Sequence, residues 1–374
     1  MTAATPIPGD LQTEVLSLVP AELSCDTTFP NGQPPCHPCI ARAAEALAAG
    51  EVVAIPTETV YGLAANALSA CAVGRVYTAK NRPADNPLIV HVSSLDMLAS
   101  LYPPGWALPS VYEAIVRDLW PGPLTILLPR SHLVPDVVTC GQSTMAVRMP
   151  AHPVALALIA ACGFPLAAPS ANSSGRPSPT LARHVLDDLG GRVPLILDGG
   201  ACTYGVESTV LDGLRNPPAI LRPGGITHEQ LAGYPGLEGL QLYRRDFVDP
   251  QLEAAPSTPG MKYRHYSPNA PVLLLDPGDA PAASVSDEAL AARQQDKLEE
   301  ARQGDLWPQR LPPYEYVLGH VSRPAAVASE LYAALRHMDE VGVAVIVVEG
   351  VRDTGAGVAV MNRLRKAASR VVAV

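Results

Sequence analysis

Two tripeptides combine residue types that could bind a phosphate chain. Lys80-Asn81-Arg82 places two cations within three residues, and Ser170-Ala171-Asn172 lies in a small, hydroxyl-rich segment. A nucleotide site needs cations for the phosphates, and small residues or backbone amides that permit close approach. Read alone, the first tripeptide is also typical of a basic helix end, and the second of an ordinary turn. Together they predict two sides of one phosphate-binding pocket.

A third segment offers polar groups for a second substrate. Residues 56–62, Pro-Thr-Glu-Thr-Val-Tyr-Gly, directly follow an apolar run that is typical of a buried strand. Ligands of open α/β sheets bind at the carboxyl ends of strands, so this segment predicts hydroxyl and carboxylate groups at such a site. Capping of the next turn by Thr57 and Thr59 explains the same residues equally well.

Three further polar residues stand at the ends of predicted strands. Arg148 ends one strand, Ser208 begins another, and Arg222 ends a third, which suggests a shared rim. The sequence contains no Gly-x-Ser-x-Gly, no Gly-x-x-x-x-Gly-Lys-Ser/Thr and no Gly-x-Gly-x-x-Gly. A catalytic triad that uses His91, and the familiar ATPase and dinucleotide folds, therefore lose their main support.

The elements that must position these residues alternate between helix and strand. Pro153 and Gly163 illustrate the signals, because they are typical start and stop residues of a helix. Helices are predicted at residues 40–49, 70–80 and 154–162, and strands at residues 52–55, 88–92, 124–128, 145–148, 195–197, 208–211 and 219–221. This alternation predicts an α/β fold.

A second, smaller α/β domain is predicted after the first. The regular pattern lapses at residues 236–271, which are rich in Pro, Tyr and Arg. It returns with a strand at residues 272–275, an amphipathic helix at 325–337 and a β-branched strand at 343–348. We therefore divide the chain into an N-terminal extension (1–38), a domain that carries the candidate site (39–235), a linker or lid (236–270) and a C-terminal domain (271–374).

The composition excludes several classes of protein. Of the 374 residues, 48% are hydrophobic and 17% are charged, which argues against disorder over most of the length. A net charge of −9 offers no broad basic surface for nucleic acid. No apolar run reaches the about 20 residues that cross a bilayer, so we expect a cytoplasmic protein without a membrane partner.

The cysteines favour reduced thiols over a disulfide framework. There are seven, an odd number, and they are scattered through a long chain. Cys36 and Cys39 resemble half of a zinc site, but no second pair at matching spacing follows, so we predict no protein-held metal.

Taken together, the motifs resemble those of YrdC-like threonylcarbamoyl-AMP synthases. Lys80-Asn81-Arg82 and Ser170-Ala171-Asn172 match the KxR and SxN signature. Residues 56–62, 206–210 and 221–224 occur in the order and approximate spacing of that family. Residues 257–268 resemble the connector of the long family form, and residues 357–367 resemble the end of its second domain. The first 40 or so residues depart from the short family form.

The resemblance implies a fold and an activity. The fold would be a twisted mixed sheet with flanking helices, joined by a structured linker to a smaller Rossmann-like domain. The activity would be that of a nucleotidyltransferase, which forms threonylcarbamoyl-AMP and pyrophosphate from L-threonine, bicarbonate or CO2, and ATP with Mg2+. The product would pass to an enzyme that transfers it to tRNA, as part of the threonylcarbamoyladenosine modification.

The resemblance also implies roles for individual residues. Lys80, Arg82 and Arg222 would neutralise charge during catalysis, and Arg148 would bind the threonine carboxylate through two hydrogen bonds. Asn172 would brace its own loop, and the linker would close as a lid that excludes water. The implied ATP-binding set is Lys80, Arg82, Asn86, Thr144, Ser170, Asn172, Ser178, Arg222, Tyr263 and His265, and the implied threonine-binding set is Thr59, His91, Arg148, Ala168 and Ser208.

Two other functions remain open at this point. An RNA-binding or ribosome-associated module would use the same type of fold, but the net charge of −9 argues against tight nucleic-acid binding. A transferase that forms a carbamoyl adenylate for metalloenzyme maturation would add zinc-finger-like cysteine pairs and an acylphosphatase-like domain, and neither is visible in the sequence.

Overall fold

The first domain is built on one long mixed sheet. A computed structural model describes the chain except for residues 1–10, 24–36, 244–245, 255, 259–264, 279–285, 304–315 and 321. The eleven-stranded sheet has the order β1-β8-β2-β3-β7-β4-β6-β5-β9-β10-β11. Its strands are β1 (Glu14–Ser17), β2 (Val53–Ile55), β3 (Gly62–Asn66), β4 (Ile89–His91), β5 (Leu124–Pro129), β6 (Thr144–Arg148), β7 (Leu166–Ala167), β8 (Leu195–Asp198), β9 (Thr209–Asp212), β10 (Ala219–Arg222) and β11 (Gln241–Leu242).

Helices flank this sheet and end at residues that the sequence marks clearly. They are α1 (Pro38–Ala48), α2 (Ala70–Lys80), α3 (Leu95–Ala99), α4 (Ser110–Leu119), α5 (Asp136–Thr139), α6 (Pro153–Cys162), α7 (Ala182–Leu189), α8 (His228–Leu231) and α9 (Pro250–Ala254), with a 3-10 helix at Pro20–Leu23. The Ser69 hydroxyl caps α2 by accepting from the Ala72 amide. Asn81 then ends α2 in the left-handed conformation, with φ of 53°, so Arg82 leaves the helix axis.

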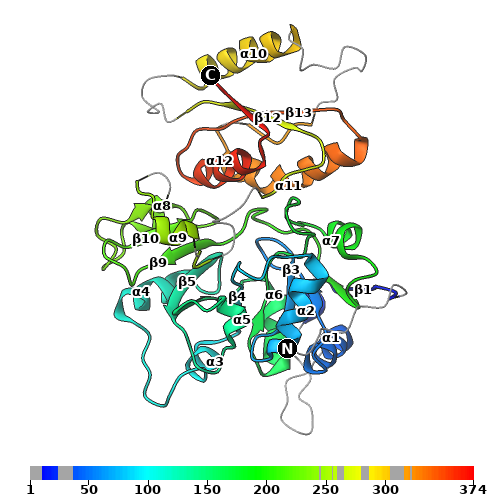
Figure 1. The fold of residues 1–374 in the computed structure, drawn as a ribbon, viewed down its shortest axis with the longest axis vertical. Coiled ribbons are helices and arrows are strands. Elements are labelled where there is room, and N and C mark those ends of the chain that lie inside the picture. Colours follow the sequence, from blue (N-terminus) through cyan, green and yellow to red (C-terminus); the bar gives the residue numbers. More distant parts are fainter. Residues whose placement is uncertain are drawn as a thin grey trace.

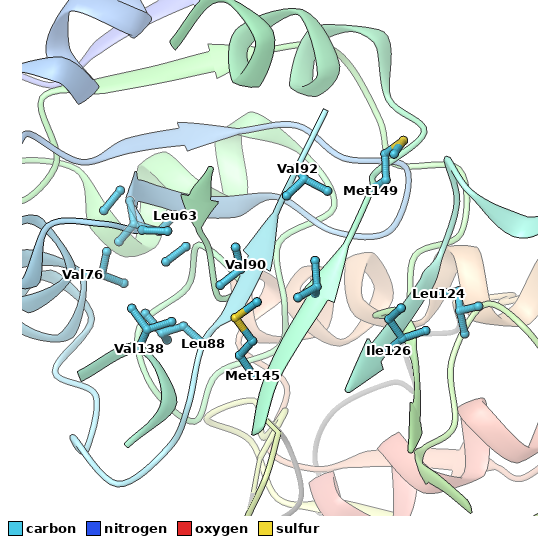
Figure 2. Packing of buried hydrophobic residues seen from close by; sticks show 14 of the residues in the cluster. Leu63, Val76, Leu88, Val90, Val92, Leu124, Ile126, Val138, Met145 and Met149 are labelled. Carbon is cyan, nitrogen blue, oxygen red and sulfur yellow. The ribbon is translucent and has the colours of Figure 1, made fainter. Parts of the chain in front are cut away.

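Side chains alternate between the two faces of the sheet, and one face packs on the largest hydrophobic core cluster. Leu88, Val90 and Val92 project into the largest core cluster together with Ile126 and Met145, as Figure 2 shows. Successive side chains of a strand point to opposite faces. The intervening residues of β4 and β6, which include His91 and Arg148, therefore face the other way, and this second face carries the candidate site.

The C-terminal domain contains a three-stranded parallel sheet. Its strands, in the order β13-β12-β14, are β12 (Val272–Asp276), β13 (Ile346–Glu349) and β14 (Arg370–Ala373). Its helices are α10 (Asp287–Gln303), α11 (Pro324–Val341) and α12 (Ala356–Ala367). Helices α11 and α12 lie between this small sheet and the first domain (Figure 1). Val60 and Val206 of the first domain join its apolar core, so the two domains share buried surface.

Most predicted elements are confirmed with small shifts at their ends. The fold class is confirmed, and helix α2 has the predicted bounds. The predicted helix at residues 325–337 is longer, because α11 runs through Val341 and Gly342 ends it with a φ of 75°. Strands β3 and β7 were not predicted separately, since Gly62–Asn66 lacks the β-branched residues typical of a strand and β7 has two residues.

The sequence predicts no specific structural role for the N-terminal extension. Strand β1 pairs in parallel with β8, so residues 14–17 complete one edge of the long sheet. Cys39 lies in α1, whereas Cys36 lies outside the described residues, and no disulfide joins the five described cysteines to one another. In the part of the chain that the structure describes, no helix is both long enough and apolar enough to span a bilayer.

Candidate active site

A cavity lies on the face of the long sheet that carries His91 and Arg148, where several strand ends and loops meet. Its empty volume is about 580 Å³. It is lined by Thr57, Thr59, Val60, Gly62, Arg82, Ile89, His91, Arg148, Ala168, Pro169, Ser170, Glu207, Ser208, Arg222, His265 and Tyr266. Nine residues of the predicted site are among these, so segments from residue 59 to residue 265 converge on one cavity.

One part of the site, the Arg148 half, consists of Thr59, His91 and Arg148, which line the cavity, and of Glu58, which pairs with Arg148 and is absent from the described lining. The Arg148 guanidinium donates to Glu58 Oε1 at 2.5 Å, to Thr59 Oγ1 at 2.8 Å and to the Gly122 carbonyl at 3.1 Å. Burial would raise the pKa of Glu58, but the charge and hydrogen bond of Arg148 lower it below its usual range. The pair is therefore ionised and almost fully buried.

His91 adds a neutral group to the Arg148 half. Burial, and then the nearby Arg148 charge, lower the pKa of His91 to about 3. Its Nδ1 lies 3.0 Å from the Ile89 carbonyl. Because a carbonyl can only accept, Nδ1 carries the hydrogen in this hydrogen bond.

The two threonines of residues 56–62 have different roles. Thr57 Oγ1 accepts from the amides of Thr59 and Val60, each at 3.2 Å, and donates to the Val60 carbonyl at 2.6 Å. Thr57 therefore closes the turn, as the capping interpretation predicted. Thr59 instead accepts from Arg148, so its hydroxyl belongs to the site.

The second part of the cavity, the Arg222 half, consists of Arg82, Ser170, Glu207, Ser208 and Arg222. Arg222 Nε and Nη2 donate to the Ser208 carbonyl at 3.1 and 2.9 Å, and Nη2 also donates to the Ser208 hydroxyl at 3.1 Å. Arg82 donates through Nε and Nη2 to the Asn86 carbonyl at 3.3 and 3.2 Å. Both guanidinium groups reach the cavity.

Lys80 lies behind the cavity wall. It is 1% exposed, and its Nζ donates to the carbonyls of Ser170 and Asn172. Burial, and then the charge of Arg82, lower its pKa. Lys80 is not among the described residues that line the cavity. In this structure its amine holds the Ser170 loop from behind the cavity wall. Its direct contact with a phosphate stays a prediction.

Other predicted residues also lie outside the cavity wall. Asn172 Nδ2 donates to the carbonyls of Ser173 and Arg176, each at 2.9 Å, and so braces the loop. Ser178 donates to Glu207 at 2.6 Å. Asn86 supplies the carbonyl that holds Arg82, and Thr144 begins β6. These four residues are absent from the described lining of the cavity.

The predicted lid lies partly outside the described residues. Tyr263 and Arg264 belong to the segment that the structure does not describe. His265 lines the cavity, and burial followed by the charge of Arg82 lowers its pKa to about 4. Tyr266 lines it as well and joins the apolar core of the C-terminal domain.

Glu207 is a site residue that sequence reasoning did not assign. Its carboxylate accepts from Ser178, from Tyr332 at 3.1 to 3.2 Å and from Arg363 Nε at 2.9 Å. Burial would raise its pKa, but the charges of Arg363 and Arg222 and the hydrogen bond from Ser178 lower it to about 2. One feature of the sequence could have revealed it. Glu207 is the single acidic residue in the segment 206–210, whose other residues are valine, serine and threonine.

The two halves differ in charge. In the Arg148 half, one guanidinium faces one carboxylate. In the Arg222 half, Arg82 and Arg222 line the cavity together with Glu207, whose charge is already balanced by Arg363 from behind. The first half therefore suits a zwitterion and the second a polyanion. The described residues contain no group of three or more His, Cys, Asp or Glu side chains that could hold a metal ion.

Comparisons with known proteins point to one family. Residues 45–224 match the Sua5/YciO/YrdC family, described as telomere recombination, and residues 226–369 match the C-terminal domain of threonylcarbamoyl-AMP synthase. The chain is 48% identical over 348 residues to the threonylcarbamoyl-AMP synthase of Schizosaccharomyces pombe, with 85% of each chain covered. It is 44% identical to that of Bacillus subtilis, over 88% of this chain and 93% of the relative. The crystal structure of Pyrococcus abyssi Sua5 complexed with L-threonine superposes with a TM-score of 0.78 and 39% identity, over 97% of this chain and 100% of the other.

Proposed function

The chain belongs to the threonylcarbamoyl-AMP synthase family, and we propose that it builds threonylcarbamoyl-AMP and pyrophosphate from L-threonine, bicarbonate or CO2, and ATP. It is thus an enzyme of threonylcarbamoyladenosine biosynthesis. Its class would be nucleotidyltransferase, because the adenylyl group moves from pyrophosphate to a carbamate oxygen. The product would pass to a separate enzyme that transfers it to tRNA.

The observation that carries this proposal is the charge difference within one cavity. A zwitterionic amino acid brings no net charge, so it suits the Arg148 half, where Glu58 already balances Arg148. A triphosphate suits the half that contains Arg82 and Arg222. The two substrates would then meet at the boundary between the halves, beside Ser208.

Arg148 retains hydrogen-bonding capacity for a threonine carboxylate. A guanidinium has five N–H groups, and three of those on Arg148 donate to Glu58, Thr59 and Gly122 in the described part of the chain. One hydrogen on each terminal nitrogen remains, and this arrangement matches the two oxygens of a carboxylate. Neutral His91 lines the same half and would contact the substrate, whereas Glu58, outside the described lining, would keep balancing the charge of Arg148.

The chemical steps require no protein nucleophile. The threonine ammonium loses a proton to solvent, and the free amine attacks the carbon of CO2. The C–N bond forms as one C=O π bond breaks, and loss of a second proton from nitrogen to solvent gives the carbamate. A carbamate oxygen then attacks the α-phosphorus of ATP, and the bond to the β-phosphate oxygen breaks with loss of pyrophosphate. Positioning and charge neutralisation by Arg82 and Arg222 would supply most of the acceleration, with Lys80 holding the Ser170 loop in place.

Magnesium would enter as part of the nucleotide substrate. Glu207, which lines the cavity, and Glu58, which lies behind the lining, each pair with an arginine, and the described residues offer no cluster of metal ligands. The ion would therefore be held by phosphate oxygens and water, as is common for Mg2+. The linker around His265 would cover the cavity and protect the mixed anhydride product from hydrolysis.

Mass spectrometry of the reaction products tests this proposal. We expect threonylcarbamoyl-AMP and pyrophosphate after incubation with ATP, L-threonine, bicarbonate and Mg2+. Omission of any one substrate should abolish the adenylate. An adenylate that forms without bicarbonate, or no adenylate at all from folded protein, would contradict the proposal.

A further inference from the structure

Arg363 of α12 reaches from the C-terminal domain to the back of the cavity wall. Its side chain is 1% exposed. Its Nε donates to Glu207 Oε2 at 2.9 Å, and its Nη1 donates to the Pro223 carbonyl at 2.6 Å. Glu207 directly precedes Ser208 and Pro223 directly follows Arg222. One guanidinium thus holds the chain beside both members of the Arg222–Ser208 hydrogen bonds.

Further contacts from the C-terminal domain converge on the same carboxylate. Tyr332 of α11 donates to Glu207 and is itself fully buried. The Arg363 guanidinium also lies 5.6 Å from the centre of the Tyr266 ring, which lines the cavity. Ser178 donates from the first domain. Both oxygens of Glu207 are therefore engaged: Oε1 accepts from Ser178 and Tyr332, and Oε2 accepts from Tyr332 and Arg363.

The charge of Glu207 would otherwise conflict with a bound triphosphate. Glu207 lines the cavity, and Arg222 is the other guanidinium that lowers its pKa. Without Arg363, a buried carboxylate would have to pair with Arg222 or take up a proton. Pairing would cancel the charge that is proposed to face the phosphates.

We propose that Arg363 is a positioning residue for ATP binding, because it neutralises Glu207 and fixes the chain on either side of Arg222 and Ser208. This inference rests on the proposed function of the site. It makes the C-terminal domain part of the nucleotide pocket, although none of its helices lines the cavity among the described residues. The domain would act on ATP and leave the threonine half unaffected.

Titration calorimetry of ATP and L-threonine against the full-length Arg363→Met variant tests the inference. Met keeps an unbranched apolar stem and removes the charged guanidinium. We expect ATP affinity to fall about tenfold or more, the scale of losing one partner of a buried ion pair, while threonine affinity changes less than about twofold. The KM for ATP in pyrophosphate release should rise in parallel.

A second substitution separates charge neutralisation from general damage. In Arg363→Met/Glu207→Gln no buried charge needs a partner, so we expect ATP affinity to return to within about threefold of wild type. Arg363→Lys keeps the charge and should stay closer to wild type than Arg363→Met. If Arg363→Met does not fold, these two variants still decide the matter, because both keep the balance of charge and should bind ATP well.

Arg365→Met is the matched control. Arg365 lies on the same helix, but its ion pairs are with Asp276 and Asp353 of the C-terminal domain. Its loss should leave ATP affinity near that of wild type. The inference is overturned if Arg363→Met binds ATP normally, if Glu207→Gln gives no rescue, or if Arg365→Met causes the same loss. Wild-type protein that makes no threonylcarbamoyl-AMP would instead refute the proposed function.

Discussion

Each half of the site has a glutamate beside a cavity-lining arginine, yet the two carboxylates are balanced in different ways. Arg148 and Glu58 pair directly with each other within the first domain. Glu207 is held by Arg363 from the C-terminal domain, and Arg222 bonds to Ser208. Arg148 and Glu58 neutralise each other, so their half of the cavity is close to neutral. Because Arg363 neutralises Glu207, the charge of Arg222 is not cancelled and its half of the cavity is cationic. The second domain therefore changes the charge of the site, although none of its described residues lines the cavity.

The largest effect is expected from loss of charge in the Arg222 half. Arg222→Met should lower pyrophosphate release by about 100- to 1,000-fold, because a cation preorganised for the transition state is lost. The protein should stay folded, as judged by an unchanged circular dichroism spectrum. Turnover within about tenfold of wild type would break the assignment of this half to the nucleotide.

A large effect on stability is expected in the Arg148 half. Arg148→Met leaves Glu58 buried and unpaired, which should lower the free energy of unfolding by about 3 to 5 kcal/mol. Urea denaturation measures this change. Arg148→Met/Glu58→Gln should regain most of the stability but not threonine binding. Recovery of threonine binding in the double variant would show that this half does not recognise the carboxylate through Arg148.

A smaller effect is expected in how the contribution of Glu207 to stability depends on pH. The folded-state pKa of Glu207 is about 2, below its ordinary value of 4.5, so its stabilising contribution is complete above pH 4.5 and is lost as the pH falls toward 2. The stability difference between wild type and Glu207→Gln should therefore shrink over this window, by on the order of 2 kcal/mol. Thermal melts at pH 6 and pH 3 measure it, and an equal difference at both values would contradict an ionised Glu207.

The sequence predicted the parts of the site that depend on short-range signals. The helix end before Arg82 and the strand ends at Arg148 and Arg222 follow from local patterns, and the structure brings these three arginine side chains to one cavity. The resemblance supplied the order of the motifs. Because the two tripeptides were predicted to form one pocket, Lys80 was expected near the Ser170 loop. The sequence alone did not show that its amine lies behind the cavity wall.

The sequence did not reveal which charged residues pair with each other. Glu58 and Arg148 are 90 residues apart, and Glu207 and Arg363 are 156 apart in different domains. Such pairs depend on how the sheet is ordered and how the domains pack, and neither is encoded in a local pattern. Glu207 was visible only as a single acidic residue, so its importance emerged from the four groups that surround it.

The account is tested most directly by titrating ATP and L-threonine separately into wild type, Arg222→Met and Arg148→Met. We predict crossed losses: Arg222→Met should lose ATP affinity by about tenfold or more and keep its affinity for threonine, and Arg148→Met should do the reverse. Equal weakening of both ligands in both variants, or losses in the opposite sense, would contradict a cavity divided into a neutral amino-acid half and a cationic nucleotide half.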